Sequence, residues 1–155
     1  MSPALGSADR RMRFQGAILD GWRLLLIKNH EQGSGKIYWL LPGGGREPGE
    51  TPQACVKREV REETGLDVEV SGLLLDIPSS LDDLYQRLLT FECHVLAGVA
   101  APGVEPEVDS DLHRTIIDVR WFDLQDESEL ASLSGDPFTF PQLLAIRDML
   151  KERDG

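Results

Sequence analysis

Residues 51–65 carry the start and stop signals of a single helix. Thr51 can serve as the N-cap, and Pro52 suits the first helical position because its fixed φ is already helical. Gly65 suits the left-handed conformation that ends many helices, so the helix is expected to run to about Thr64. The sequence therefore predicts one short helix from Pro52 to about Thr64, with other secondary structure before and after it in the chain.

Apolar-rich runs that are typical of strands occupy most of the remaining chain. The pair Asp20-Gly21 separates the first two runs and predicts a hairpin. Strands mixed with two or three helices predict an α/β layered domain. We expect a flexible tail over residues 1–12 and a single domain over 13–155, with strands over 13–20, 22–29, 37–41, 66–77, 85–98 and 115–124, a loop over 101–114, and further helices over 126–133 and 141–153.

Length and composition exclude several classes of protein. The chain has 155 residues, of which 41% are hydrophobic and 28% are charged, as is typical of a soluble domain with its own core. No apolar run approaches the ~20 residues of a membrane-spanning helix, and the first residues do not resemble a secretory signal. Two cysteines, Cys55 and Cys93, cannot form a disulfide framework, so a cytoplasmic location in a reducing compartment is expected.

The charge is distributed unevenly along the chain. The net charge is −11, and residues 67–155 hold only 6 of the 16 Lys and Arg but 19 of the 27 Asp and Glu. A long nucleic acid needs a basic track that releases counterions, so such a partner is not expected. A small phosphate substrate is compatible with this charge if divalent metals bridge the like charges. No membrane partner is expected, and a homodimer is left open.

Three glutamates of the expected helix are spaced so that they share one face. Glu59, Glu62 and Glu63 stand at i, i+3 and i+4, and carboxylates this close repel one another. Hard divalent cations with oxygen ligands would offset that repulsion, and Mg²⁺ suits one or two carboxylates together with substrate phosphates. Arg58 lies four residues before Glu62 and can pair with it across one turn. A solvated charged face is the alternative interpretation of these residues taken alone.

Residues 44–66 follow the spacing G-x5-E-x7-R-E-U-x-E-E-x-G-U without a departure, where U is a bulky aliphatic residue. This spacing resembles the signature of the Nudix hydrolases. The run YWLLPGGG before it and the run RWFDL near the end are similar to what that family shows on either side, so the resemblance covers about residues 13–150. The matching residues are Gly44, Glu50, Arg58, Glu59, Val60, Glu62, Glu63, Gly65 and Leu66.

The resemblance implies an α/β/α sandwich with a mixed β-sheet. It also implies an enzyme that hydrolyses a nucleoside diphosphate linked to another group, by water attack at phosphorus. Mg²⁺ is the expected cofactor, with Mn²⁺ as a substitute. The family pattern assigns metal binding to Glu59, Glu62, Glu63 and the carbonyl of Gly44, and a supporting catalytic role to Arg58 and Glu50.

The base that takes the proton from water has no clear position outside this segment. Many family members place a further glutamate about six residues before the late-strand tryptophan, which is Trp121 here, but that position is Thr115. We therefore assign the base to the glutamates of the helix, and predict that Glu63→Gln abolishes turnover while the fold survives. Other acids and a histidine near this position are Asp118, Asp111, His113, Glu107 and Glu105.

The substrate is expected to be a small nucleotide: a nucleotide sugar such as ADP-ribose, a nucleoside triphosphate or a dinucleoside polyphosphate. Trp39 and Tyr85 are candidates to stack on a base, and Arg23 and Arg87 are candidates to contact phosphates, although each also suits a core or surface position. The alternative is a catalytically silent nucleotide-binding sensor on the same fold. The intact set of glutamates argues against a sensor, and the missing acid at Thr115 argues weakly for it.

Overall fold

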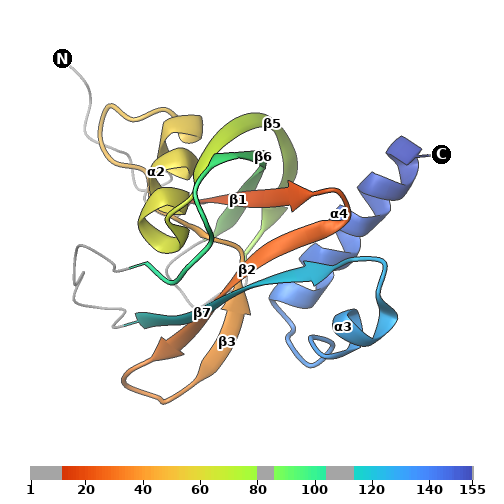
Figure 1. The fold of residues 1–155 in the computed structure, drawn as a ribbon. Coiled ribbons are helices and arrows are strands. Elements are labelled where there is room, and N and C mark those ends of the chain that lie inside the picture. Colours follow the sequence, from red (N-terminus) through yellow and green to blue (C-terminus); the bar gives the residue numbers. More distant parts are fainter. Residues whose placement is uncertain (1–11, 80–85, 104–113, 155) are drawn as a thin grey trace.

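The described part of the chain forms a β-sheet with helices on both sides (Figure 1). The computed structural model describes residues 12–79, 86–103 and 114–154. Its strands are β1 (Met12–Asp20), β2 (Arg23–Glu31), β3 (Ile37–Leu40), β4 (Gly43–Gly44), β5 (Asp67–Pro78), β6 (Arg87–Ala97) and β7 (Arg114–Asp123), and its helices are α2 (Pro52–Thr64), α3 (Glu127–Ala131) and α4 (Thr139–Asp154).

The predicted hairpin joins β1 and β2. Asp20 pairs with Arg23, so Gly21 and Trp22 form the two-residue turn, one residue later than the sequence suggested. Gly21 has a φ of 61°, a conformation that favours glycine. The predicted tail lies outside the described residues except for Met12, which is the first residue of β1.

The sheet is mixed, as predicted. Its strand order is β3-β2-β1-β6-β5, with β4 paired to β1 and β7 paired to β2. The β1–β6 pair is parallel, while the other strand pairs are antiparallel. This order places β1 in the centre of the sheet, where all of its residues between Met12 and Asp20 are buried.

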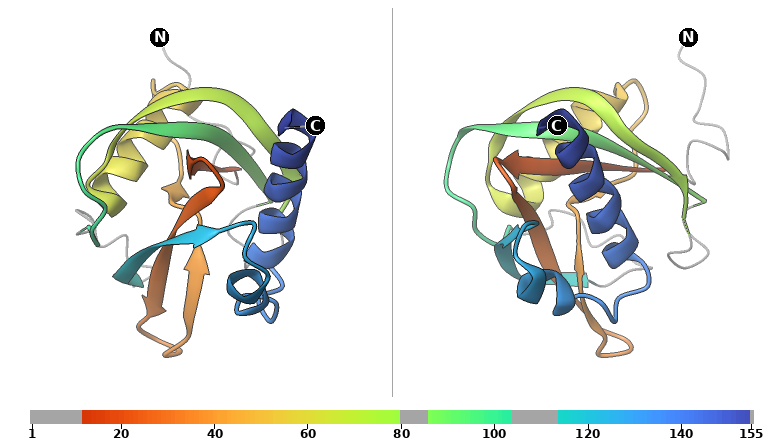
Figure 2. Two further views of the ribbon diagram at one scale, coloured as in Figure 1. Left: turned by 45° about the vertical axis from the view of Figure 1, so that its right-hand side comes forward. Right: turned by 90° about the vertical axis from the view of Figure 1, so that its right-hand side faces the viewer.

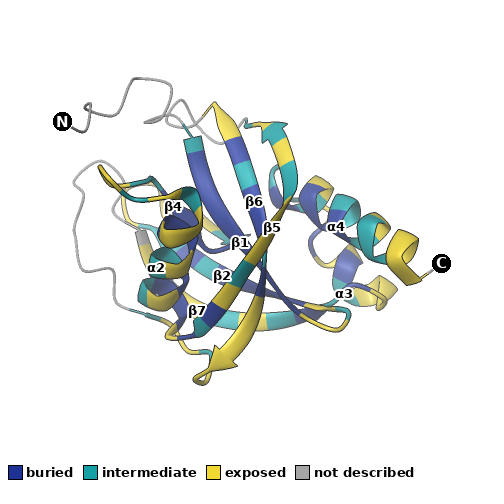
Figure 3. Ribbon diagram, turned by 90° about the horizontal axis from the view of Figure 1, so that it is seen from above, coloured by how far each residue is buried: buried dark blue, intermediate teal, exposed yellow. Residues whose placement is uncertain are grey.

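Alternate residues of β1 enter two separate cores. Ile18 packs in one core with Val60 of α2, while Leu19 packs in the other core with Leu143 of α4. Figure 2 shows α2 and α4 on opposite sides of the strands, and Figure 3 shows β1 buried along most of its length. The predicted α/β/α sandwich is therefore confirmed.

Helix α2 lies very close to β1 because Gly16 has no side chain. An ideal Cβ at Gly16 would come within 3.1 Å of Val56 Cγ1, Val60 Cγ2 and Cys93 Sγ. Cys55 and Cys93 are both fully buried, which agrees with a packing role for these residues. The small residue in the strand thus fixes the distance between the helix and the sheet.

Both ends of α2 are where the sequence predicted them. The Thr51 hydroxyl accepts a hydrogen bond from the Ala54 N–H at 3.0 Å. Gly65 has a φ of 77° and donates its N–H to the Arg61 carbonyl at 3.0 Å. Local capping therefore defines this helix.

Some elements differ from the expected ones. Helix α4 begins at Thr139, two residues early, because the Asp136 carboxylate accepts the N–H groups of Phe138 and Thr139 at 2.9 Å each. Strand β3 covers residues 37–40 of the predicted 37–41, and Ile37 at its start is 52% exposed. Most of the predicted loop over 101–114 lies outside the described residues. None of the described helices has both the length and the apolar character needed to cross a membrane.

Candidate active site

The glycine run before α2 lies against the start of β1. Gly43 and Gly44 form the short strand β4, in which Gly43 pairs with Gln15 and Gly44 pairs with Phe14. An ideal Cβ at Gly43 would overlap the Phe14 carbonyl oxygen and would come within 2.6 Å of Gln15 Cβ. Glycine is therefore required sterically, because the two backbones are in contact.

Two glutamates of α2 contact this glycine strand. Glu63 is 4% exposed, and its Oε1 accepts a hydrogen bond from the Gly43 N–H at 2.7 Å. The Glu59 carboxylate lies against Gly44, where an ideal Cβ would come within 2.7 Å of both Glu59 Cδ and Oε1. The absence of a side chain at Gly44 thus makes room for Glu59.

Arg58 connects the remaining acids of the segment. Its Nε lies 2.7 Å from Glu50 Oε2 and its Nη2 lies 3.0 Å from Glu50 Oε1, which is a two-pronged ion pair. Its Nη1 lies 2.8 Å from Glu59 Oε1 and 3.3 Å from Glu62 Oε2. Arg58 also donates to the Gly45 carbonyl at 3.2 Å. The predicted Arg58–Glu62 pair is present, and Glu50 forms the two-pronged contact with Arg58.

The electrostatics of the acids differ with their surroundings. Burial opposes ionisation of Glu50, but hydrogen bonds from Arg58 and from the Glu47 N–H outweigh it, so the pKa of Glu50 lies below its ordinary value. Burial raises the pKa of Glu59, and the nearby Glu62 carboxylate raises it further, although Arg58 partly offsets both effects. The pKa of Arg58 is raised chiefly by its hydrogen bonds to Glu50.

The donor set fits a hard divalent cation chemically. The carboxylates of Glu59 and Glu63 contact the Gly43–Gly44 strand, Glu62 lies on the same helix, and all three offer oxygen donors. In the side-chain positions described here, no three acidic, histidine or cysteine side chains converge on one point, since Glu63 turns to Gly43 while Glu59 and Glu62 share Arg58. A cation bound by these acids would thus compete with Arg58 for Glu59 and Glu62.

Arg23, predicted to contact phosphates, lies at the opposite end of β1. Arg23 pairs with Asp20 at 2.5 Å, and its guanidinium stacks 5.1 Å from the centre of the Trp121 ring. Phe14, which pairs with Gly44, is six residues from Asp20 along the strand. At about 3.3 Å per residue, the backbone of Arg23 is therefore roughly 20 Å along β1 from that of Gly44, against which Glu59 lies.

The other predicted substrate residues are not gathered at the glutamates either. Trp39 packs edge-on against Phe122, with ring centres 5.1 Å apart, in the core on the α4 side of the sheet, away from α2. Arg87 begins β6 and pairs with Asp76 of β5 at 2.5 Å. Tyr85 lies outside the described residues.

The position of the missing acid is on β7. The Thr115 hydroxyl accepts a hydrogen bond from the Gln32 amide at 2.9 Å. Asp118 is exposed and accepts the Val119 N–H at 2.9 Å. The other four candidates at this position lie outside the described residues: Glu105, Glu107, Asp111 and His113.

Two features of the site were not found from the sequence. One is the Gly43 N–H, whose partner Glu63 lies 20 residues later. The other is Arg13, which is 1% exposed, donates to the Leu41 carbonyl at 2.9 Å and acts on Glu59 as a nearby positive charge. An arginine within an apolar strand sequence is a signal that could have identified it, because a buried arginine needs partners.

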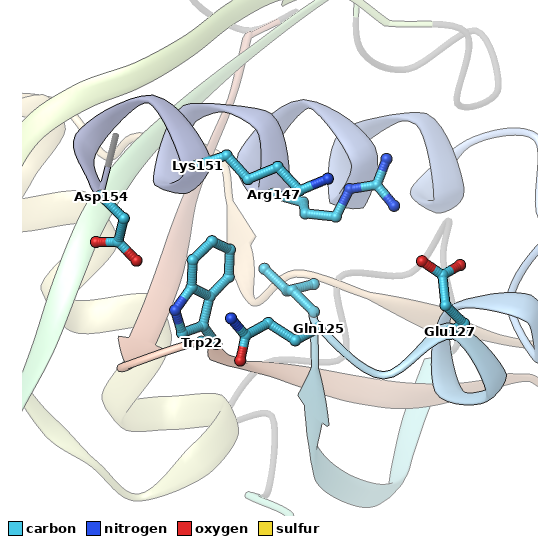
Figure 4. Close-up of a pocket in the computed structure, with 7 residues that line it drawn as sticks. Trp22, Gln125, Glu127, Arg147, Lys151 and Asp154 are labelled. Atoms are coloured by element: carbon cyan, nitrogen blue, oxygen red, sulfur yellow. The ribbon is translucent and has the colours of Figure 1, made fainter.

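A cavity at another place in the structure contains none of these glutamates. It lies between α4 and the β1–β2 turn, where Figure 4 shows the Trp22 ring facing the side chains of Arg147 and Lys151. Basic and acidic groups are mixed along its wall. Its lining residues are Trp22, Leu124, Gln125, Glu127, Arg147, Lys151 and Asp154.

Two curated proteins are similar to this chain in part of their sequences. A MutT-like protein from Streptomyces ambofaciens is 51% identical over 51 residues, which are 33% of this chain and 30% of that protein. An 8-oxo-dGTP diphosphatase from Proteus vulgaris is 35% identical over 65 residues, which are 42% of this chain and 54% of that protein. The chain thus spans about half or less of the length of these two curated relatives.

A solved structure and a family model extend the similarity over most of the chain. The crystal structure of a MutT Nudix hydrolase from Burkholderia pseudomallei has a TM-score of 0.60 and 28% identity, and the match covers 87% of this chain and 94% of that one. The model of the NUDIX domain matches residues 10–142. The described α/β fold and the spacing of residues 44–66 agree with that match. The chain belongs to the Nudix hydrolase family.

Proposed function

We propose that this protein is a Mg²⁺-dependent pyrophosphohydrolase that cleaves a nucleoside diphosphate linked to another group. One observation carries the proposal: α2 brings Glu59 and Glu63 against the Gly43–Gly44 strand, and Arg58 joins Glu59 to Glu62. This arrangement puts three carboxylates, which are hard oxygen donors, on one helix beside the glycine strand, and a cation would have to draw Glu59 and Glu62 away from Arg58 to bind them.

The reaction needs little covalent chemistry from the protein. A water oxygen attacks one phosphorus, the bridging P–O bond breaks, and the bridging oxygen leaves with the other phosphate. When bound, Mg²⁺ supplies charge neutralisation for the diphosphate oxygens and makes a bound water more acidic. The residues of this chain then hold the charges in place and accept the proton of the water, so that positioning and electrostatics provide most of the catalysis.

Each residue has a distinct part in this proposal. Glu59, Glu62 and Glu63 would hold the metal, and one of these carboxylates would take the proton of the attacking water. Arg58 orients Glu59 and Glu62 by direct hydrogen bonds, and Glu50 orients Arg58 through its two-pronged pair. Candidate substrates are nucleotide sugars such as ADP-ribose, nucleoside triphosphates and dinucleoside polyphosphates, and a cytoplasmic enzyme meets all three.

The test is hydrolysis of a substrate panel with those three classes, in buffer with Mg²⁺ and with ¹⁸O-labelled water. We expect one class to release a nucleoside monophosphate or pyrophosphate, with one ¹⁸O atom in the product that was attacked. Removal of metal with EDTA should stop the reaction, and Mg²⁺ or Mn²⁺ should restore it. Turnover that continues unchanged in EDTA would contradict the metal-dependent mechanism.

A nucleotide sensor without catalysis is the second candidate, because Thr115 stands where many family members have an acid. The same panel separates the two functions. A sensor would show a nucleotide-dependent rise in melting temperature together with no hydrolysis of any compound. A hydrolase would show release of product at the same nucleotide concentrations.

A further inference from the structure

The C-terminal end of α2 is covered by a segment that follows β6. The last carbonyl groups of a helix have no partner inside the helix and must find donors elsewhere. Gly65 supplies one donor, to the Arg61 carbonyl at 3.0 Å. Two more come from residues 98–103, which leave β6 and run beside α2 (Figure 1).

Residues 98–103, here called the capping segment, donate two backbone hydrogen bonds. The Ala101 N–H donates to the Thr64 carbonyl at 3.0 Å, and the Gly103 N–H donates to the Glu63 carbonyl at 2.9 Å. Pro102 has no N–H, so the donors on either side of it match two successive carbonyls of the helix. The capping segment is thus joined to the turn that carries the candidate metal ligands.

Gly103 packs against the backbone of this turn. An ideal Cβ at Gly103 would overlap the Glu62 carbonyl oxygen and would lie 2.8 Å from the Glu62 carbonyl carbon and 2.9 Å from that of Glu63. These neighbours are backbone atoms, which cannot rotate away as the end of a side chain can. Any residue with a Cβ at this position must therefore move either the capping segment or the last turn of α2.

The charge of this turn gives the contact a second effect. The C-terminus of a helix carries partial negative charge, which disfavours acidic side chains in the last turn. Glu62 and Glu63 lie in that turn, and the N–H groups of Ala101 and Gly103 bring partial positive charge to it. The capping segment therefore both fixes the backbone of the two glutamates and offsets part of their unfavourable position.

We propose that the capping segment positions the metal ligands, and that Gly103 is the residue that sets the location of Glu62 and Glu63. This inference rests on the proposed function, in which these glutamates hold a divalent cation. Gly103 acts through the helix backbone and is a positioning residue. Loss of a residue that orients metal ligands without binding the metal itself commonly lowers metal affinity by about 10- to 100-fold.

The test compares Gly103→Ala with Gly72→Ala. Gly72 is an exposed glycine of β5, and an ideal Cβ there would meet no described atom within 4 Å. Binding of Mn²⁺ to each purified protein is followed by the loss of the free-ion EPR signal, and amide hydrogen exchange is measured on the same samples. We expect Mn²⁺ affinity to fall about 10-fold in Gly103→Ala, with no change in Gly72→Ala.

Amide exchange shows whether the affinity changes for the proposed reason. In Gly103→Ala, the amides of residues 101 and 103 should exchange faster while those of β1 and β6 stay protected. If the amides of residues 101 and 103 exchange faster but Mn²⁺ binds as in the parent, the proposal is overturned. If the parent itself binds no Mn²⁺, the metal site is overturned and this inference with it.

A second variant covers the case in which Gly103→Ala does not fold. Ala101→Pro removes one of the two N–H donors and leaves Gly103 in place. It should lower Mn²⁺ affinity in the same direction but by less, and excess Mg²⁺ should restore its turnover. Parent-like Mn²⁺ affinity in this variant, with the Gly103 amide exchanging faster than in the parent, would show that the capping segment does not position the ligands.

Discussion

The Gly43 N–H donates a hydrogen bond to Glu63 Oε1 at 2.7 Å and so joins the strand before α2 to the last turn of that helix. Glu63 is 4% exposed, which makes it the most buried of the three glutamates that the sequence placed on one face. Its carboxylate is held by the backbone of the glycine run, whereas Glu59 and Glu62 are held by Arg58.

Replacement of Glu63 by glutamine should abolish turnover and leave the fold intact. Glutamine keeps an oxygen that can accept the Gly43 N–H, but it loses the negative charge that binds a cation. We expect kcat to fall by about 100-fold or more, with a similar thermal unfolding midpoint. Glu69→Gln, at an exposed position of β5, is the matched control. An unfolded Glu63→Gln protein, or one of full activity, would be inconsistent with this role.

Replacement of Gly44 by alanine should displace Glu59. The new Cβ would come within 2.7 Å of the Glu59 carboxylate, so that side chain must leave its present position. Loss of one oriented ligand predicts a decrease in Mg²⁺ affinity of about 10- to 100-fold, measured as the Mg²⁺ concentration for half-maximal activity. Gly33→Ala, where an ideal Cβ meets no described atom within 4 Å, should behave as the parent. Equal Mg²⁺ requirements in both variants would argue that Gly44 needs no open space.

Replacement of Arg58 by lysine should lower both stability and activity. Lysine keeps the charge but cannot form the two-pronged pair with Glu50 while also reaching Glu59 and Glu62. Because these acids are largely buried, we expect the free energy of unfolding to fall by about 2 kcal/mol in urea titrations. Arg61→Lys, on the exposed side of the same helix, should change it by less than about 0.5 kcal/mol. A stable, fully active Arg58→Lys protein would refute the supporting role of the guanidinium.

The stability contributed by Glu50 should depend on pH. Its pKa in the folded state lies below the ordinary value of 4.5, because hydrogen bonds from Arg58 and from the Glu47 N–H outweigh the effect of burial. A carboxylate with a lowered pKa stabilises the fold fully above its unfolded pKa, and this contribution is lost as the pH falls through the folded value. Glu50→Gln should therefore be less stable than the parent near neutral pH, and the difference should shrink as the pH falls below the ordinary value of 4.5. Urea unfolding at several pH values measures it, and a difference that is constant with pH would contradict the assignment.

Local signals predicted α2 well because each of them acts within a few residues. The hydroxyl of Thr51 needs only the Ala54 N–H, and the left-handed conformation of Gly65 needs only the absence of a Cβ. The hairpin was predicted for the same reason, although the turn lies one residue later than Asp20-Gly21 suggested.

The candidate substrate-binding residues were chosen because their side chains are aromatic or basic, and this property does not specify where a residue lies in the fold. Trp39 lies in the core on the α4 side, and Arg23 lies at the far end of β1 from Gly44, because strand direction and sheet order decide where a side chain points. The resemblance to Nudix hydrolases identified the candidate metal-binding and supporting residues within residues 44–66, but it gave no positions for residues outside that segment.

The sequence by itself determined the ends of α2 and the spacing of Glu59, Glu62 and Glu63, because helix geometry and capping act over short distances along the chain. The tertiary structure decided which group holds each acid. Gly43 reaches Glu63 across 20 residues, and Gly103 reaches the same residue across 40, through contacts that exist only once the sheet has brought these segments together.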